Sequence, residues 1–154
     1  MDALAPLCTS LAGAPEPSLS RTHSMWHLST SIEGKLRDPD MPSVTIARHL
    51  HPTPAVCGVP VRAASRFIRE HEPFGRGLYG GAVGWSDGSR DGRWMVTLRC
   101  AEVDGRAASL YAGAGILPTS DPSAECEETS AKFHAMLSAF GITEDGERAG
   151  RAER

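Results

Sequence analysis

The sequence predicts an α+β fold, in which an antiparallel sheet is flanked by helices. Strand-forming runs separated by turn residues occupy residues 78–113. Apolar residues repeat at helical spacing on either side of this region, over residues 60–72 and 121–140. The chain has 154 residues, of which 40% are apolar, and one hydrophobic core is expected at this length and composition.

The N-terminal third is predicted to hold a helix, a strand and loops. Apolar residues repeat at helical spacing over residues 2–11, and a glycine and two prolines in residues 13–18 end this predicted helix. Residues 25–32 have the aromatic and β-branched content of a strand, and we expect this strand to join the sheet. Residues 38–42 form a polar loop. The two prolines of residues 51–55 push the residues before them out of the helical region, so we expect irregular backbone there.

The sheet itself is predicted from a series of strands and turns. Residues 78–85 form a glycine-rich strand, and glycine in a strand allows another backbone or a ligand to approach closely. Residues 88–92 form a turn, and residues 94–100 form the next strand. The Asp-Gly pair at residues 104–105 is a strong hairpin signal, with residues 108–113 as the return strand.

Two helices are expected to cover this sheet. The first spans residues 60–72 and is stopped by Pro73. The second spans residues 121–140 and ends at Gly141. The remaining residues, 142–154, are mostly charged residues and glycine, so we expect a disordered tail.

Composition excludes several classes of function. The formal net charge is −3, from 16 basic and 19 acidic residues, and this argues against nucleic-acid binding, which needs a basic face. The sequence contains no apolar run of membrane-spanning length and does not open with a signal peptide, so we expect a cytoplasmic protein. The four cysteines are far apart, so we expect buried, inert thiols in place of disulfides or a zinc site.

The second predicted helix carries the strongest chemical signal. Glu125, Glu128 and Lys132 fall within about 60° of one another on a helical wheel, beside the apolar stripe. Glu128 and Lys132 can simply form an i,i+4 ion pair on a solvated face. Two carboxylates three residues apart can also hold a hard divalent cation such as Mg²⁺, with the lysine placed to bind a substrate carboxylate.

Other candidate residues have two interpretations each. Arg99 interrupts an apolar strand and is either an edge residue or a buried fork for an anion. Gly113 and Gly115 either end a strand or present amides to a carboxylate. Tyr79 is either a core residue or a hydroxyl donor, and His27 is either a core histidine or a ligand.

Six segments of the chain resemble, in order, the C-terminal part of the chorismate-utilising enzymes, and most closely the isochorismate synthase type. They are MWHLST at residues 25–30, HPTPAVCGVP at 51–60, LYGGAVGW at 78–85, VTLRCA at 96–101, AGAGI at 112–116 and ExxETxxK at 125–132. The resemblance implies part of a layered α/β sandwich, with residues 1–141 as the C-terminal part of a chorismate-binding domain.

The resemblance also implies roles for individual residues. The metal ligands for Mg²⁺ would be Glu128, with Glu125 beside it. His27 matches the active-site histidine near the metal-bound carboxylate of the substrate. The residues that would bind chorismate are Ala55, Tyr79, Arg99, Gly113, Gly115 and Lys132.

Ala55 indicates the subtype, because isochorismate synthases carry alanine where anthranilate, aminodeoxychorismate and salicylate synthases usually carry threonine. The implied reaction is a reversible, Mg²⁺-dependent exchange of the chorismate C4 hydroxyl for a water-derived hydroxyl at C2. It needs a general base for the water and a general acid for the departing hydroxyl. Such isomerases serve menaquinone or siderophore synthesis.

The base lysine, the acid glutamate and a further metal-binding glutamate of the family lie upstream of the matching region. Neither Lys35 nor Lys132 is at the base position. We therefore expect a fragment that is weakly active or inactive alone. The alternatives are a non-catalytic module that complements a separate N-terminal half or self-associates through exposed apolar surface, and a salicylate or anthranilate synthase relative.

Overall fold

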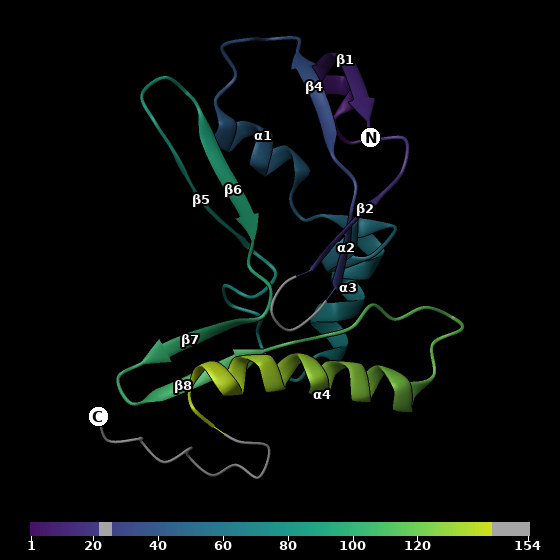
Figure 1. Cartoon of the computed structure of the whole chain (residues 1–154), viewed down its shortest axis with the longest axis vertical. Helices are drawn as coiled ribbons and strands as arrows, with labels where there is room; N and C mark the ends of the chain where they lie inside the picture. Colours follow the sequence, from purple (N-terminus) through teal and green to yellow (C-terminus); the bar gives the residue numbers. More distant parts are fainter. Residues whose placement is uncertain (22–25, 143–154) are drawn as a thin grey trace. The chain divides into compact units, whose positions relative to one another are not determined.

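The computed structural model describes residues 1–21 and 26–142, which contain helices and paired strands (Figure 1). The chain divides into two compact units. Unit 1 comprises Met1–His51 and Ala82–Met95, and unit 2 comprises Pro52–Gly81 and Val96–Arg154. None of the described helices is long and apolar enough to cross a membrane.

Unit 1 is built mainly from short paired strands. Two antiparallel pairs come first, β1 (Cys8–Gly13) with β4 (Ile32–Leu36) and β2 (Ser18–Arg21) with β3 (Trp26–Ser29). The remaining elements are η1 (Ala5–Leu7), α1 (Ser43–Leu50), β5 (Ala82–Ser86) and β6 (Gly92–Val96). The Ser43 N–H donates to the Arg90 carbonyl at 3.0 Å, which ties the start of α1 to the β5–β6 turn.

Unit 2 holds the helices that the sequence predicts. Its elements are α2 (Pro54–Cys57), α3 (Val61–His71), β7 (Cys100–Asp104), β8 (Ala107–Tyr111) and α4 (Pro122–Ala139). At the start of α4 the Asp121 carboxylate accepts from the Ala124 N–H at 2.9 Å, and beyond its end Gly141 takes a positive φ of 69°. The helices expected over residues 60–72 and 121–140 are therefore confirmed.

The predicted N-terminal helix is wrong. Only the single turn η1 forms, and the chain then enters β1, where it pairs with β4. Thr9 and Ser10 are weak helix formers, and the Thr9 hydroxyl donates to the Lys35 carbonyl across the pair at 3.2 Å. Pairing with a distant strand therefore overrides the local helical pattern.

The strands form four separate pairs in the described part of the chain, and the expected continuous sheet over residues 78–113 is not seen. The predicted strand over residues 94–100 is interrupted after Val96, because Arg99 takes a left-handed φ of 49° in a bend before β7. The strand expected over residues 25–32 is divided between β3 and β4, and it pairs with β2 and β1 instead. Met25 lies outside the described residues.

The hairpin at residues 104–105 is confirmed. Strands β7 and β8 pair antiparallel from Cys100 opposite Tyr111 to Asp104 opposite Ala107, and Gly105 takes a φ of 57°. Helix α1 has no counterpart in the prediction. Helix α2 begins at Pro54, so the expectation of irregular backbone over residues 51–55 fails for its last two residues, since proline is tolerated in a first helical turn.

Burial in the described residues is shallow. Among the described residues, Cys8 and Met136 are the buried apolar side chains, with 7% and 8% of their surface exposed. Large apolar side chains such as Phe67, Leu78 and Val103 remain more than half exposed. The four cysteines are free, but the expectation that they are buried holds only for Cys8, because Cys57 and Cys100 are half-buried and Cys126 is exposed.

Candidate functional site

Tyr79 lies in unit 2 between the end of α3 and the start of β5, and two neighbours fix its ring. It stacks on Tyr111 with 5.4 Å between ring centroids and 13° between ring planes. The guanidinium carbon of Arg76 lies 5.5 Å from the Tyr79 ring centroid. The Tyr79 N–H also donates to the Arg76 carbonyl at 2.8 Å. Ring and backbone are thus both held, so the direction of the phenol hydroxyl is fixed.

The Tyr79 hydroxyl lies against the backbone of Gly113, just beyond β8. A Cβ added to Gly113 would sit 2.8 Å from the Tyr79 oxygen, closer than real Cβ contacts come. Glycine at this position therefore lets the phenol approach the chain. This is the close-approach role for which glycine is used in and near strands.

Lys132 reaches the same point from α4. Its Nζ donates to the Gly113 carbonyl at 2.8 Å, and its side chain is only 20% exposed. The same Nζ lies 2.6 Å from Oε1 of Glu128, one turn earlier on α4. The Glu128 side chain is 57% exposed. Unit 2 thus brings together four of the predicted site residues, which are Tyr79, Gly113, Lys132 and Glu128. We call these four residues the Tyr79–Lys132 cluster.

The protonation of Tyr79 follows from its surroundings. Burial is the largest influence and raises the pKa of Tyr79 above its ordinary value of 10.0, while the charge of Arg76 partly opposes this rise. The phenol is therefore neutral at neutral pH and can donate a hydrogen bond. The hydrogen bond to Glu72 likewise raises the pKa of Arg76, which remains a cation.

Three further predicted residues of unit 2 occupy its loops and short helix. Ala55 is exposed on α2. Arg99 is exposed in the bend between β6 and β7, so it is neither a strand-edge residue nor a buried anion fork. Gly115 is exposed beyond β8, and an added Cβ there would meet open space, so sterics do not require glycine at this position.

His27 belongs to unit 1. Its backbone lies in β3, in register with Ser20 of β2. The predicted strand therefore carries this histidine, though in a different strand pair from the one expected.

Glu125 and Glu128 of α4 are the kind of ligand that Mg²⁺ takes, but each has a hydrogen-bond or ion-pair partner of its own. Oε1 of Glu125 accepts from the Ser120 hydroxyl at 2.6 Å, and Glu128 is paired with Lys132. Over residues 1–21 and 26–142 no three His, Cys, Asp or Glu side chains gather in a way that could hold a metal ion. Mg²⁺ takes one or two protein carboxylates and completes its near-octahedral shell with waters and substrate oxygens, so Glu125 and Glu128 fit the ion by the chemistry of their side chains.

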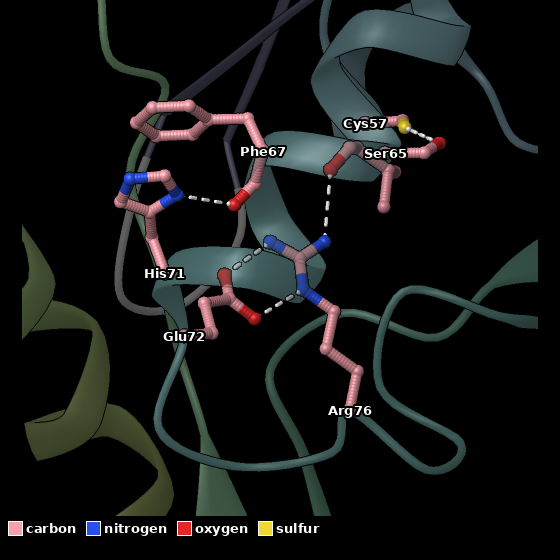
Figure 2. Close-up of polar contacts among 7 residues, drawn as sticks. Cys57, Ser65, Phe67, His71, Glu72 and Arg76 are labelled. Atoms are coloured by element: carbon pink, nitrogen blue, oxygen red, sulfur yellow. Dashed lines mark hydrogen bonds and ion pairs between the residues drawn. The ribbon is translucent and has the colours of Figure 1, made fainter.

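A second group of polar residues beside Tyr79 was not identified from the sequence. Figure 2 shows Arg76 hydrogen-bonded to the Glu72 carboxylate, and Cys57 of α2 beside Ser65 of α3. Arg76, Cys57 and Ser65, but not Glu72, border a hollow of about 200 Å³. Its lining residues are Pro52, Val56, Cys57, Ser65, Ile68, Arg69, Arg76, Tyr79 and Gly80. The i,i+4 spacing of Glu72 and Arg76 is the one signal that could have indicated this ion pair, although helix α3 ends before Glu72.

Comparison with known proteins identifies the class. The chain belongs to the chorismate binding enzyme family, whose model matches residues 1–141. It is 51% identical over 140 residues to isochorismate synthase DhbC of Bacillus subtilis, and 50% identical over 142 residues to the putative isochorismate synthase MenF of Mycobacterium tuberculosis. Each alignment covers 91% of this chain but only 35% and 38% of the two relatives. The chain thus spans a little over a third of their length.

Solved structures support the same assignment. The putative 2,3-dihydroxybenzoate-specific isochorismate synthase DhbC of Bacillus anthracis superposes with a TM-score of 0.89 at 48% identity, over 92% of this chain and 38% of that one. The menaquinone-specific isochorismate synthase MenF of Escherichia coli gives a TM-score of 0.78 at 36% identity, over 89% of this chain and 31% of that one. The expected partial α+β chorismate-binding fold is confirmed.

Proposed function

We propose that residues 1–141 supply the C-terminal, chorismate-binding part of an isochorismate synthase-type isomerase. The observation that carries this proposal is the Tyr79–Lys132 cluster. Lys132 Nζ lies 2.8 Å from the Gly113 carbonyl, and the Tyr79 hydroxyl lies against the Gly113 backbone. An ammonium group, a neutral phenol and a glycine N–H can each donate a hydrogen bond to a carboxylate, and chorismate is a dicarboxylate.

Each residue of the cluster has a defined part in this proposal. An ammonium group has three donors, and Lys132 directs two of them to Gly113 and Glu128, so a third remains for a chorismate carboxylate. The Tyr79 hydroxyl donates to the same carboxylate. The Arg99 guanidinium binds the second carboxylate, and the backbone amides at Gly113 and Gly115 assist.

The metal and the proton-transfer groups complete the proposed reaction. Glu125 and Glu128 would hold Mg²⁺ together with ligands from outside this chain, and the ion would polarise and orient the bound carboxylate. The proposal also includes the catalytic role that the family resemblance implies for His27. The general base and general acid come from the portion of the relatives that this chain does not span, so the chain alone binds chorismate without isomerising it.

Calorimetric titration of chorismate into the chain, with Mg²⁺ present, tests the proposal. We expect saturable binding that weakens at least tenfold in Lys132→Met, because a charged hydrogen bond to the carboxylate is lost. The matched control is Lys35→Met, since Lys35 is an exposed lysine of β4 in unit 1, and this variant should bind as the unmodified chain does. Equal affinity in all three proteins would contradict the proposal.

A second assay tests the catalytic half of the proposal. Chromatography of chorismate incubated with the chain and Mg²⁺ should show no isochorismate above the rate without protein. Robust turnover would contradict the view that the proton-transfer groups lie outside this chain.

A second candidate function, assembly with a partner, is favoured by the exposed apolar side chains. Phe67, Leu78 and Val103 are 61%, 72% and 62% exposed, whereas apolar side chains of this size normally contribute to a core. The partner that covers these side chains would be a separately encoded portion of the same domain or a second copy of the chain. A monodisperse monomer by light scattering, with no dye binding to apolar surface, would contradict it.

A further inference from the structure

Arg76 connects three parts of unit 2. Its Nε and Nη2 donate to Oε2 and Oε1 of Glu72 at 2.8 and 2.6 Å, just beyond the end of α3. Its Nη1 donates to the Val56 carbonyl in α2 at 3.2 Å. Its guanidinium also covers the ring of Tyr79. Figure 2 shows the guanidinium reaching from its loop to the Glu72 carboxylate and toward α2.

The contacts around α2 couple the position of this helix to the position of Tyr79. A Cβ added to Gly80 would lie 2.9 Å from Cγ1 of Val56, so the residue after Tyr79 packs directly on α2. The Gly80 N–H donates to the Thr97 carbonyl at 2.8 Å, and the Thr97 N–H donates to the Gly81 carbonyl at 3.0 Å. A shift of α2 would therefore displace the backbone that carries Tyr79.

We propose that Arg76 is a positioning residue, which holds the Ala55-bearing helix α2 against the Tyr79 loop and so sets the geometry of the chorismate-binding site. The inference rests on the proposed function for its substrate. Arg76 acts through Val56 and Tyr79 and is not itself a substrate ligand. Nothing in the sequence motifs that carry the family resemblance assigns it this role.

The chemistry of the contacts requires arginine in particular. The guanidinium is a planar fork that can serve Glu72 with two nitrogens and Val56 with the third at the same time. A lysine keeps the charge near Glu72 and Tyr79, but its single nitrogen cannot span both partners in this geometry. Charge and geometry can therefore be separated by substitution.

Helix α2 has a second attachment, which makes the test practicable. Cys57 Sγ lies 2.8 Å from the Ser65 hydroxyl of α3, so α2 stays tethered when Arg76 is replaced. Arg66 supplies a matched control, because it forms an i,i+4 pair with Glu70 in which the side chains are 73% and 58% exposed. Replacing Arg66 removes a comparable ion pair far less buried than that of Arg76.

The experiment compares Arg76→Met, Arg76→Lys and Arg66→Met in a Tyr111→Phe background. The chain has two tyrosines, so this background leaves Tyr79 as its one tyrosine, and the ionisation of Tyr79 can be followed by ultraviolet absorbance. Arg76→Met should raise the pKa of Tyr79 further, because the arginine charge lowers it, whereas Arg76→Lys should leave it nearer the parent value. Both Arg76 variants should bind chorismate at least tenfold more weakly, and Arg66→Met should match the parent in both assays.

The outcomes separate this inference from the proposed function. Parent-like chorismate affinity in Arg76→Lys would overturn the positioning role, as would an unchanged Tyr79 titration in Arg76→Met. If the unsubstituted chain binds no chorismate, the proposed function fails, and the amide NMR signals of Ala55 and Val56 then decide the inference. Large shifts of these signals in Arg76→Lys support positioning of α2, and unchanged signals overturn it.

Discussion

Replacing Lys132 by methionine should destabilise the fold measurably even without substrate. Methionine keeps the length and apolar stem of the side chain but removes the ammonium. Two contacts are lost, the hydrogen bond from Nζ to the Gly113 carbonyl at 2.8 Å and the ion pair with Glu128 at 2.6 Å. The first of these links α4 to the chain beyond β8, so its loss weakens the attachment of α4 to that segment.

The size of the effect follows from exposure. The Glu128 side chain is 57% exposed, so the i,i+4 ion pair contributes only about 0.3–0.5 kcal/mol. A hydrogen bond from a charged donor contributes about 1.5–3 kcal/mol, and the lower end applies where solvent reaches the bond. The loss in the free energy of unfolding should therefore be about 1–2 kcal/mol for Lys132→Met and below about 0.5 kcal/mol for Glu128→Gln.

Urea unfolding followed by circular dichroism measures these differences, with a constant m-value as the check on two-state behaviour. Lys35→Met is the control and should change the free energy of unfolding by less than about 0.5 kcal/mol, because Lys35 is exposed on β4. Equal effects of Lys132→Met and Glu128→Gln would refute the reasoning, since the bond to Gly113 would then contribute nothing.

Three further outcomes are expected. Gly113→Ala should lower the free energy of unfolding by about 1–3 kcal/mol and weaken chorismate binding, because the new Cβ would lie 2.8 Å from the Tyr79 hydroxyl; calorimetry that finds unchanged affinity would contradict this. Gly105→Ala should cost about 1 kcal/mol in urea unfolding, because Gly105 has a φ of 57°, while leaving chorismate affinity unchanged. The pKa of Tyr79 is raised in the fold, so its contribution to stability is complete below pH 10.0, the ordinary pKa, and is lost as pH rises through the raised value. This pH prediction would be contradicted if the free energy of unfolding stayed constant above pH 10.0 in the unsubstituted chain but fell in Tyr79→Phe.

The sequence predicts those elements whose determinants are local. Helix α4 has an Asp121 cap and a terminal Gly141, and the β7–β8 hairpin has its Asp104-Gly105 turn, so both are recovered. The fold of residues 2–13 depends instead on pairing with β4, about 20 residues further along the chain, which no helical period reveals. The break at Arg99 is a backbone conformation, and residue type alone does not specify a left-handed φ at arginine.

The candidate site shows the same division. The wheel of residues 121–140 correctly groups Glu128 with Lys132, because they lie on one helix. The contact of Lys132 with Gly113 and the approach of Tyr79 to Gly113 depend on tertiary packing. The family resemblance implied only that these three residues serve one substrate site, and their contacts were not predicted. Arg76 belongs to none of the recognised motifs. Its spacing from Glu72 could have indicated their ion pair, but its bond to the Val56 carbonyl depends on tertiary packing.

The most direct test of the proposed function is an NMR titration with chorismate. The chain contains two lysines, Lys132 and Lys35, so protein labelled with ¹³C-lysine gives two sets of side-chain signals, which Lys35→Met assigns. Chorismate with Mg²⁺ should shift the Lys132 Cε signal in a saturable way and leave the Lys35 signal in place. Shifts of both signals to the same extent, or of neither, would contradict the claim that Lys132 receives a carboxylate of chorismate.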